Sequence, residues 1–480
     1  MRIDMWCSTA GLAARGETAT TRAVRVAAVA AVGVALGFGG APVATAQDYI
    51  VTNLGSLNGG EVHPAGMNEY GHVVGWEGFF PNDQDAFLWT PSGGMVALPF
   101  LPGSTAYAEA FDINNNGVIV GIAERSPGVR RAVKWQNGTV VDLGTLGSSS
   151  TLNSGALGLN DKGEVVGYAE NGQTDVNGWP IRRAVKWSAN NVIQDLGVLI
   201  GGDTHSYAYD INNYGVACGY SDDGPGGAFV RHPVKYENGT VSFLGSLGGT
   251  FGHAWAINDA GEIAGDSYLT GNSRTRAFKW SKGVLKDVGA LTSTSYSFPT
   301  GINTFGQMSG ISPNTSRPQA VRWVGANDVI QNINNFMPPG SPTLDSAEDV
   351  NGVGQVIVEA SSFPFGGYLL TPPVKQLPLY GPDPGLVGRN NTFTVYGATP
   401  GATVRFYYGL RVGSTAVPGC PGVNIDINTA NFGGAVTANA DGRAAITGFT
   451  PNGARGRTVY YQATEQGTCR VSNRVGYRYP

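Results

Sequence analysis

One short pattern that recurs seven times constrains this chain more than any other feature. In residues 113–121 it reads Ile-Asn-Asn-Asn-Gly-Val-Ile-Val-Gly, an apolar step, a polar turn closed by glycine, and a second apolar run. The glycines that close the seven turns stand 46, 46, 52, 46, 45 and 48 residues apart. Such a nearly fixed period indicates a repeat architecture. The turns are Asn68–Gly71, Asn114–Gly117, Asn160–Gly163, Asn212–Gly215, Asn258–Gly261, Asn303–Gly306 and Asn351–Gly354.

The chemistry of the turn is that of a hairpin connection. The asparagine side chain accepts hydrogen bonds from the following backbone, and glycine adopts the positive φ that the turn requires. An Asn-rich loop could instead bind calcium, but no copy has the EF-hand spacing with its closing glutamate, and most carry one carboxylate or none. The pattern favours the turn.

Each repeat contains four short apolar runs separated by Gly or Asn. In the second copy we predict strands over 108–114, 117–124, 131–136 and 139–146. Four antiparallel strands in about 45 residues, repeated in series, are typical of β-propeller blades. The third run usually ends in Trp, as at Trp135 and Trp187, and this regular spacing favours packing between blades over sugar stacking.

The order of strands at the two ends predicts a ring. Residues 49–57 resemble the fourth strand of a repeat, but the first three strands of that repeat are missing before them. The last copy ends after its third strand, at 371–373, and lacks a fourth. An open array would leave two unpaired sheet edges, whereas a ring leaves none. We therefore predict an all-β fold, with a seven-bladed β-propeller over 47–373 that is closed by the N-terminal strand.

The strand before each turn has a second repeated feature. Asp112, Asp210 and Asp349 all lie two positions before the turn asparagine, in the second, fourth and seventh copies. Paired catalytic carboxylates would need to face one another at short range. Repetition at one register favours a structural hydrogen bond to a neighbouring strand.

The N-terminus has the features of an export signal. Arginines 15, 22 and 25 precede an apolar run over 26–38, and Ala-Thr-Ala follows at 44–46. This predicts a signal peptide over 1–46, cleaved before Gln47. The run is too short and glycine-rich for a good membrane span, so we expect a secreted or extracellular protein without a transmembrane anchor.

The C-terminal part differs from the repeats. Residues 374–385 are rich in proline and predict a linker, and 386–480 contain alternating apolar and polar runs that predict a small Ig-like β-sandwich. Cys420 and Cys469 lie in this part and predict a disulfide in an oxidising compartment. Four tyrosines are candidate exposed ligand contacts of this module: Tyr407, Tyr408, Tyr460 and Tyr461. The alternative is a passive spacer.

The repeats resemble the extracellular HAF-repeat family of bacterial exported proteins. The resemblance rests on Asp85-Ala86-Phe87-Leu88-Trp89, on Arg276-Ala277-Phe278-Lys279-Trp280, and on the run Asp142–Gly147. It covers the propeller-like part of the chain. The histidine that opens the family's tripeptide is missing from every copy, which argues against a catalytic histidine there. The family is defined by its repeat and implies no reaction.

The loops that lead from a fourth strand into the next first strand should emerge on one face, which is the default ligand site of a propeller. The candidate ligand-binding residues on this loop face are Glu61, His63, Tyr107, Glu109, His205, Tyr207, His253, Tyr296 and Asp345. The alternative is that these side chains cap blade edges. His63, His205 and His253 lie in separate copies without short zinc-ligand spacing, so we predict no metal site and no cofactor.

Composition limits the partners. Only 14% of the residues are charged and the net charge is −4, without a large basic field, so we expect no nucleic-acid partner. No nucleophile motif occurs in a credible context, and we predict no catalytic residue. We expect a monomeric, exported, non-enzymatic binding or scaffold protein for an extracellular glycan or protein. The alternative is a propeller hydrolase or lyase acting on extracellular polysaccharide, with Glu61, Glu109 and Asp345 as its acids.

Overall fold

The structure is a computed structural model, and it describes residues 49–79, 83–104, 107–200, 204–223, 230–314, 317–360 and 366–480. The predicted signal peptide, 1–46, lies outside the described residues. The described chain is all-β, with three short 3₁₀ turns at η1 (Thr270–Asn272), η2 (Ile333–Phe336) and η3 (Asn452–Ala454). No helix in these ranges has the length and apolarity to cross a membrane.

The second repeat forms one four-stranded antiparallel sheet, as the sequence predicts. Its strands pair in chain order: β6 (Ala108–Ile113), β7 (Ile119–Ser126), β8 (Val129–Gln136) and β9 (Thr139–Asp142). The last strand is four residues shorter than predicted. Gly144 has a φ of 79°, and its N–H donates to the Asp142 carboxylate, so the chain turns away there.

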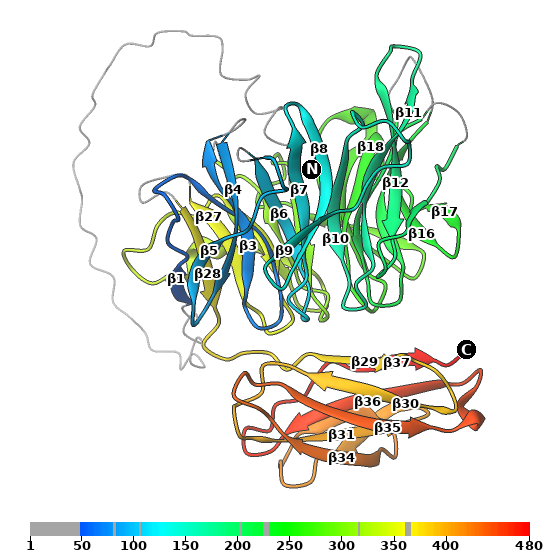
Figure 1. Cartoon of the computed structure of the whole chain (residues 1–480). Helices are drawn as coiled ribbons and strands as arrows, with labels where there is room; N and C mark the ends of the chain where they lie inside the picture. The colour runs from blue at the N-terminus through cyan, green and yellow to red at the C-terminus, as the bar shows by residue number, and fades with distance from the viewer. Residues whose placement is uncertain are drawn as a thin grey trace, which may run out of the picture. The chain divides into compact units, whose positions relative to one another are not determined.

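Three further sheets have the same strand order (Figure 1). The first repeat contains β2 (Val62–Met67), β3 (Val73–Phe79), β4 (Asp83–Thr90) and β5 (Gly94–Ala97). The third contains β10 (Ser154–Leu159), β11 (Val165–Thr174), β12 (Pro180–Trp187) and β13 (Ile193–Asp195). The sixth contains β22 (Phe298–Ile302), β23 (Met308–Ile311), β24 (Ala320–Val324) and β25 (Val329–Asn332).

The fourth and fifth repeats are joined into one larger sheet. A parallel contact between Arg231 and Phe251 links them, because the first strand of the fifth repeat begins unusually early. Their strands are β14 (Ser206–Ile211), β15 (Ala217–Asp222), β16 (Arg231–Glu237) and β17 (Thr240–Phe243), then β18 (Gly248–Ile257), β19 (Ile263–Leu269), β20 (Thr275–Ser281) and β21 (Val284–Gly289).

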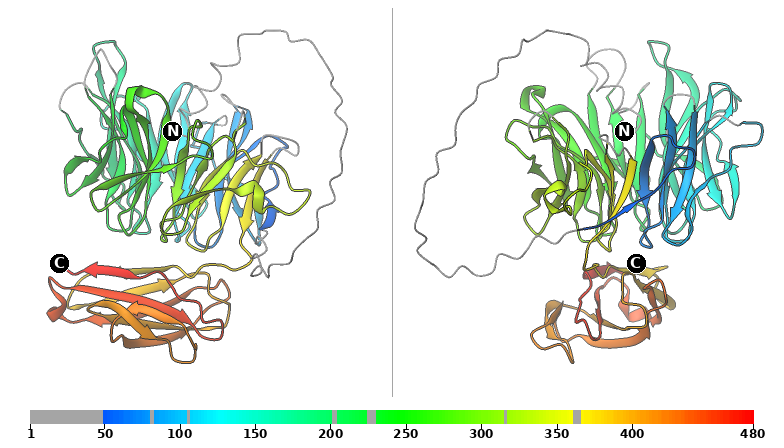
Figure 2. Two further views of the ribbon diagram at one scale, coloured as in Figure 1. Left: turned by 180° about the vertical axis from the view of Figure 1, so that it is seen from behind. Right: turned by 90° about the vertical axis from the view of Figure 1, so that its left-hand side faces the viewer.

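The seventh repeat pairs with the N-terminal strand. Its sheet contains β26 (Ser346–Val350), β27 (Val356–Ala360), β28 (Gly366–Thr371) and β1 (Ile50–Asn53). Val51 lies opposite Leu370 in an antiparallel register, and Figure 2 shows the dark blue strand beside the yellow ones. The first described strand and the last strand of the repeats therefore belong to one sheet.

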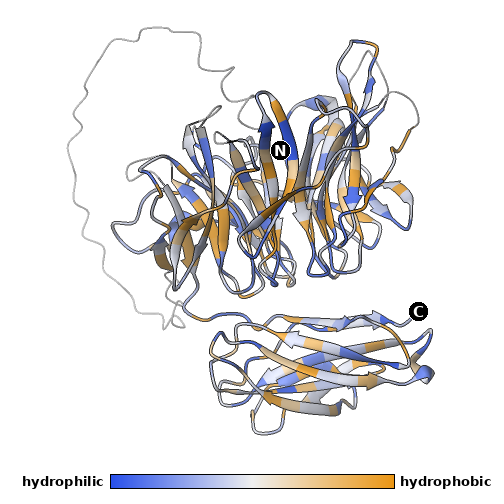
Figure 3. Ribbon diagram, viewed as in Figure 1, coloured by the Kyte–Doolittle hydropathy of each residue, from blue (hydrophilic) through white to orange (hydrophobic). Residues whose placement is uncertain are grey.

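The tryptophans of the third strands pack between neighbouring sheets. Trp187 is fully buried among residues of the second and third repeats, and its indole N–H donates to the Leu143 carbonyl at 2.7 Å. Trp135 and Trp323 are buried in the same way and donate to the carbonyls of Pro99 and Val288. These contacts confirm the prediction that the repeated tryptophans pack in the core between blades. Figure 3 shows the alternation of apolar and polar residues along the strands.

The C-terminal part forms two antiparallel sheets and a hairpin. One sheet has β29 (Leu379–Asp383), β30 (Arg389–Val395) and β35 (Ala444–Thr450), and the other has β34 (Asn431–Thr437), β31 (Thr403–Gly409), β36 (Thr458–Glu465) and β37 (Val475–Arg478). The hairpin pairs β32 (Val412–Ala416) with β33 (Asn424–Ile427). Residues of both sheets share one core. The predicted disulfide, Cys420–Cys469, is confirmed.

Two expectations for this part need correction. Strand β29 lies inside the expected linker 374–385, because Leu377 and Leu379 are buried in the core of the two sheets. Tyr407, expected to be exposed, is buried beside the β32–β33 hairpin, whereas Tyr408 is exposed. The side chains of adjacent strand residues alternate, so only one of the two could face solvent.

Candidate functional site

The repeated turns form one hydrogen-bonded series, which explains why asparagine recurs. The Asn114 carboxamide oxygen accepts from the backbone N–H groups of Asn116 and Val118, and its amino group donates to the Asn160 carbonyl at 3.0 Å. Each turn asparagine donates in this way to the turn of the next repeat, and Asn351 donates to Asn68. The asparagine therefore serves its own turn and its neighbour.

The repeated aspartates join neighbouring sheets, as predicted. Asp112 accepts from its own neighbour, the Ile113 N–H, and from the Leu159 N–H of the next repeat at 3.0 Å. Asp210 and Asp349 accept equivalent bonds from the next repeat. Burial, and the nearby charges of Asp210 and Asp349, raise the pKa of Asp112 to about 8. These acids are structural links.

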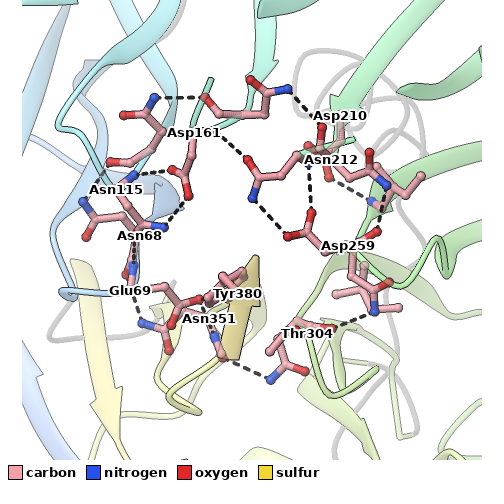
Figure 4. Close-up of a pocket in the computed structure, with 18 of the residues that line it drawn as sticks. Asn68, Glu69, Asn115, Asp161, Asp210, Asn212, Asp259, Thr304, Asn351 and Tyr380 are labelled. Atoms are coloured by element: carbon pink, nitrogen blue, oxygen red, sulfur yellow. Dashed lines mark hydrogen bonds between the residues drawn. The ribbon is translucent and has the colours of Figure 1, made fainter. Parts of the chain in front are cut away.

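A polar pocket of about 170 Å³ lies among the seven turns (Figure 4). Tyr380 of strand β29 reaches its lining and donates to the Glu69 carboxylate at 2.6 Å. Burial raises the pKa of Glu69 to about 7, although Tyr380 and the Gly352 N–H favour its charged form. The sequence carries no signal for Tyr380, because this residue lies outside the repeated pattern.

The described residues contain no group of three or more His, Cys, Asp or Glu side chains that could hold a metal ion. Most polar groups that line the pocket are already bonded to one another. Asp161, for example, accepts from the backbone and the side chain of Asn115. The pocket is therefore chiefly a structural feature of the turns.

A different cluster lies near the start of the first strands. An arginine recurs at one position of the third strand in the second, third and fourth repeats, at Arg130, Arg182 and Arg231. In each repeat it stands five residues before the aromatic residue near the end of that strand. Each guanidinium covers a buried tyrosine ring, with centroid distances of 3.7, 5.2 and 4.7 Å to Tyr107, Tyr168 and Tyr220. The cation–π geometry fixes these arginines.

Ring contacts connect the Arg182 and Arg231 pairs across the sheets, and Tyr107 shares a buried cluster with Tyr168. Tyr207 lies 4.7 Å from Tyr168 and 5.0 Å from Tyr220, and it accepts a hydrogen bond from Arg182 at 2.9 Å. His253 contacts the Tyr220 ring edge at 5.4 Å. We call this set the arginine–tyrosine band: Tyr107, Arg130, Tyr168, Arg182, Tyr207, Tyr220, Arg231 and His253.

The charges of the band are largely paired. Arg182 lies 3.6 Å from Glu170, and Arg231 lies 3.4 Å from Asp222. Burial raises the pKa of Asp222 to about 6, although Arg231 opposes this effect. A surface on which each cation already faces an acid attracts polyanions weakly.

Two predicted site residues adjoin the band. Glu109 is 3% exposed, and its carboxylate oxygen Oε2 has no hydrogen-bond partner among the described residues. Burial raises its pKa, although a hydrogen bond from Tyr107 opposes the effect. His63 stacks on Trp76 and interacts with Glu359 at 3.2 Å. Burial lowers the pKa of His63, but Glu359 and Glu61 together hold it above its usual value.

The other predicted residues lie in different settings. Glu61 is 3.8 Å from His63, and His205 accepts from the Arg182 N–H and lies 3.8 Å from Asp175. Tyr296 packs its ring against Phe298, and Asp345 is paired with Arg317 at 3.0 Å. Of the predicted residues, Tyr107 and Glu109 thus lie side by side, whereas Tyr207 and His253 both contact the Tyr220 ring.

Comparison with known proteins assigns no family. No family model matches this chain, and no curated protein matches it. Among solved structures, TolB from Acinetobacter baumannii is 11% identical over 55% of this chain and 63% of its own, with a TM-score of 0.35. Hydrazine synthase from Kuenenia stuttgartiensis is 10% identical over 86% of this chain and 65% of its own, with a TM-score of 0.30. The match spans less than two thirds of either structure, and similarity at this level assigns no function.

Proposed function

We propose that the chain is an exported protein of the HAF-repeat type, a closed seven-bladed β-propeller followed by an Ig-like module. The pairing of β1 with β28 supports this, and so does the hydrogen bond from Asn351 back to Asn68. Because β1 supplies the fourth strand of the last sheet, strand β28 is not left as an unpaired edge.

The function proposed for this fold is non-enzymatic binding or scaffolding, with the loop face presented to an extracellular glycan or protein. The arginine–tyrosine band carries the proposal, because it spans adjacent sheets with planar groups that are already fixed by one another. Groups ordered before binding lose little entropy when a ligand arrives.

A second candidate is a hydrolase or lyase of extracellular polysaccharide. Glu109 favours it, because its buried carboxyl has a raised pKa and one oxygen without a hydrogen-bond partner among the described residues, which are properties of a general acid. Such a mechanism requires a second carboxylate about 5 to 9 Å away. Asp345, one of the acids expected from the sequence, is instead paired with Arg317.

One experiment tests both candidates. The mature protein, 47–480, is incubated with an array of polysaccharides and secreted proteins, and both retention and released product are measured. The binding function predicts retention without product, and a loss of retention in Tyr207→Ala but not in the control Phe449→Ala, which truncates an exposed side chain of strand β35. Product release that is abolished in Glu109→Gln would establish the enzyme, and no retention of any kind would refute binding.

A further inference from the structure

The hairpin of the third repeat carries an exposed tryptophan. Strands β11 and β12 have 10 and 8 residues, and the hairpin extends beyond its neighbours (Figure 1). At its tip, Trp179 is 69% exposed and Val176 is 65% exposed. Trp187, at the far end of strand β12, is fully buried. Trp179 and Val176 are thus both exposed at one loop tip, and binding residues are often carried on such loops.

The tip is held in one conformation. The Asp175 carboxylate accepts from the backbone N–H groups of Asn177 and Trp179 at 2.9 Å, and the Asp175 N–H donates to the Trp179 carbonyl at 2.8 Å. Gly178 adopts a φ of 81° to complete the turn. The backbone N–H and carbonyl of Trp179 are therefore both held, so the ring projects from an ordered position of the turn.

The same aspartate connects the tip to the arginine–tyrosine band. Asp175 lies 3.8 Å from His205, and His205 accepts from the Arg182 N–H at 3.3 Å. Arg182 in turn donates to Tyr207. The tip thus stands at the edge of the surface to which the binding function is assigned above.

The chemistry around the tip selects among ligands. Residues 171–179 contain no Lys or Arg and one acid, Asp175, whereas Asn171, Gln173 and Thr174 offer amides and a hydroxyl. Acidic glycans and anionic membranes are attracted by cations, which are absent from this tip. An aromatic ring flanked by neutral polar groups suits a ligand with apolar C–H faces and hydroxyl edges.

We propose that Trp179 is the stacking platform of a subsite for a pyranose ring of a neutral polysaccharide. The glycan continues from this subsite toward the arginine–tyrosine band. The inference rests on the proposed binding function and specifies its ligand class.

The test compares mature wild type with Trp179→Ala and Trp179→Phe. The probes are soluble xylan, galactomannan and dextran as neutral glycans, alginate as an acidic glycan, and vesicles containing phosphatidylglycerol. The control is Phe449→Ala, which removes a side chain that is 66% exposed on β35. We expect Trp179→Ala to weaken binding of a neutral glycan about tenfold, Phe to retain most of the affinity, and the control to have no effect.

Fluorescence gives a second readout, because a sugar stacked on an exposed indole changes its emission. This change should be present in wild type and absent in Trp179→Phe. If wild type binds a neutral glycan and Trp179→Ala binds it equally well, the subsite is refuted while the binding function stands. Preference for alginate or vesicles also refutes it. If wild type retains no polysaccharide, the glycan-binding function and the subsite both fail.

Discussion

The amino group of Asn351 donates a hydrogen bond to the backbone carbonyl of Asn68, 283 positions earlier in the chain, at 3.0 Å. The same asparagine accepts from the Gln355 N–H of its own turn. One side chain therefore combines a local turn with a contact between the last repeat and the first.

Replacing Asn351 with aspartate should separate these two roles. Aspartate can still accept from the Gln355 N–H, but it can donate neither to the buried Asn68 carbonyl nor to the Gln355 side-chain oxygen. We expect a loss of about 1–3 kcal/mol in the free energy of unfolding, measured by denaturant titration. Asn439→Asp is the matched control, because exposed Asn439 accepts the same bonds in its own turn, from Asp441 and Arg443. Equal effects of the two substitutions would contradict the role of the contact.

The buried tryptophans should contribute far more to stability than Trp179. In Trp187→Phe the side chain loses volume in the core, and the Leu143 carbonyl loses its donor. We expect a cost of about 2–4 kcal/mol in unfolding free energy. Trp179→Phe, in the same hairpin, should change stability by less than about 0.5 kcal/mol. A large effect of Trp179→Phe would show that this side chain is structural.

The disulfide should stabilise the C-terminal sheets. Cys420 and Cys469 close a loop with a sequence separation of 49, so replacing both with serine should cost about 2–4 kcal/mol. Calorimetry should show a lower melting temperature for residues 379–480, and the melting temperature of the repeats should stay unchanged. An unaltered profile would mean that the two sheets are stable without the bond.

Stability should also depend on pH through Asp112. Aspartate in an unfolded chain titrates near pH 4, whereas burial raises the pKa of Asp112 to about 8 in the folded protein. The folded state therefore favours the protonated form, and the contribution of Asp112 is complete below about pH 4 and is lost as the pH rises through about 8. Asp112→Asn should flatten the plot of unfolding free energy against pH over this range. The control is Asp195→Asn, because the Asp195 side chain is exposed. Equal slopes in the two variants would contradict the raised pKa of Asp112.

Much of the repeated part could be predicted because its signals are local. An asparagine three positions before a glycine fixes each turn, and the register of Asp112, Asp210 and Asp349 indicates their shared role. The hairpin that carries Trp179 also leaves a trace, since the longest interval between turn glycines, 52 residues, separates Gly163 from Gly215.

The site was less predictable, because its contacts join residues at different positions of different repeats. Arg130, Arg182 and Arg231 share one offset, but Tyr107 precedes a first strand, while Tyr168 and Tyr220 belong to second strands. Neither period nor spacing shows which tyrosine lies beneath which arginine. The pairing of Arg182 with Glu170 and of Arg231 with Asp222, on which the proposal of a neutral ligand relies, depends on the same packing.

Hydrogen exchange at strand β28 tests the closed propeller most directly. The backbone amides of 366–371 should exchange slowly in the mature protein, because β28 is paired on one side with β27 and on the other with β1. Deleting 49–57, which removes β1 and the buried side chains of Tyr49 and Leu54, should accelerate exchange in 366–371 and lower the melting temperature of the repeats. Unchanged protection and an unchanged melting temperature after the deletion would contradict closure by the N-terminal strand.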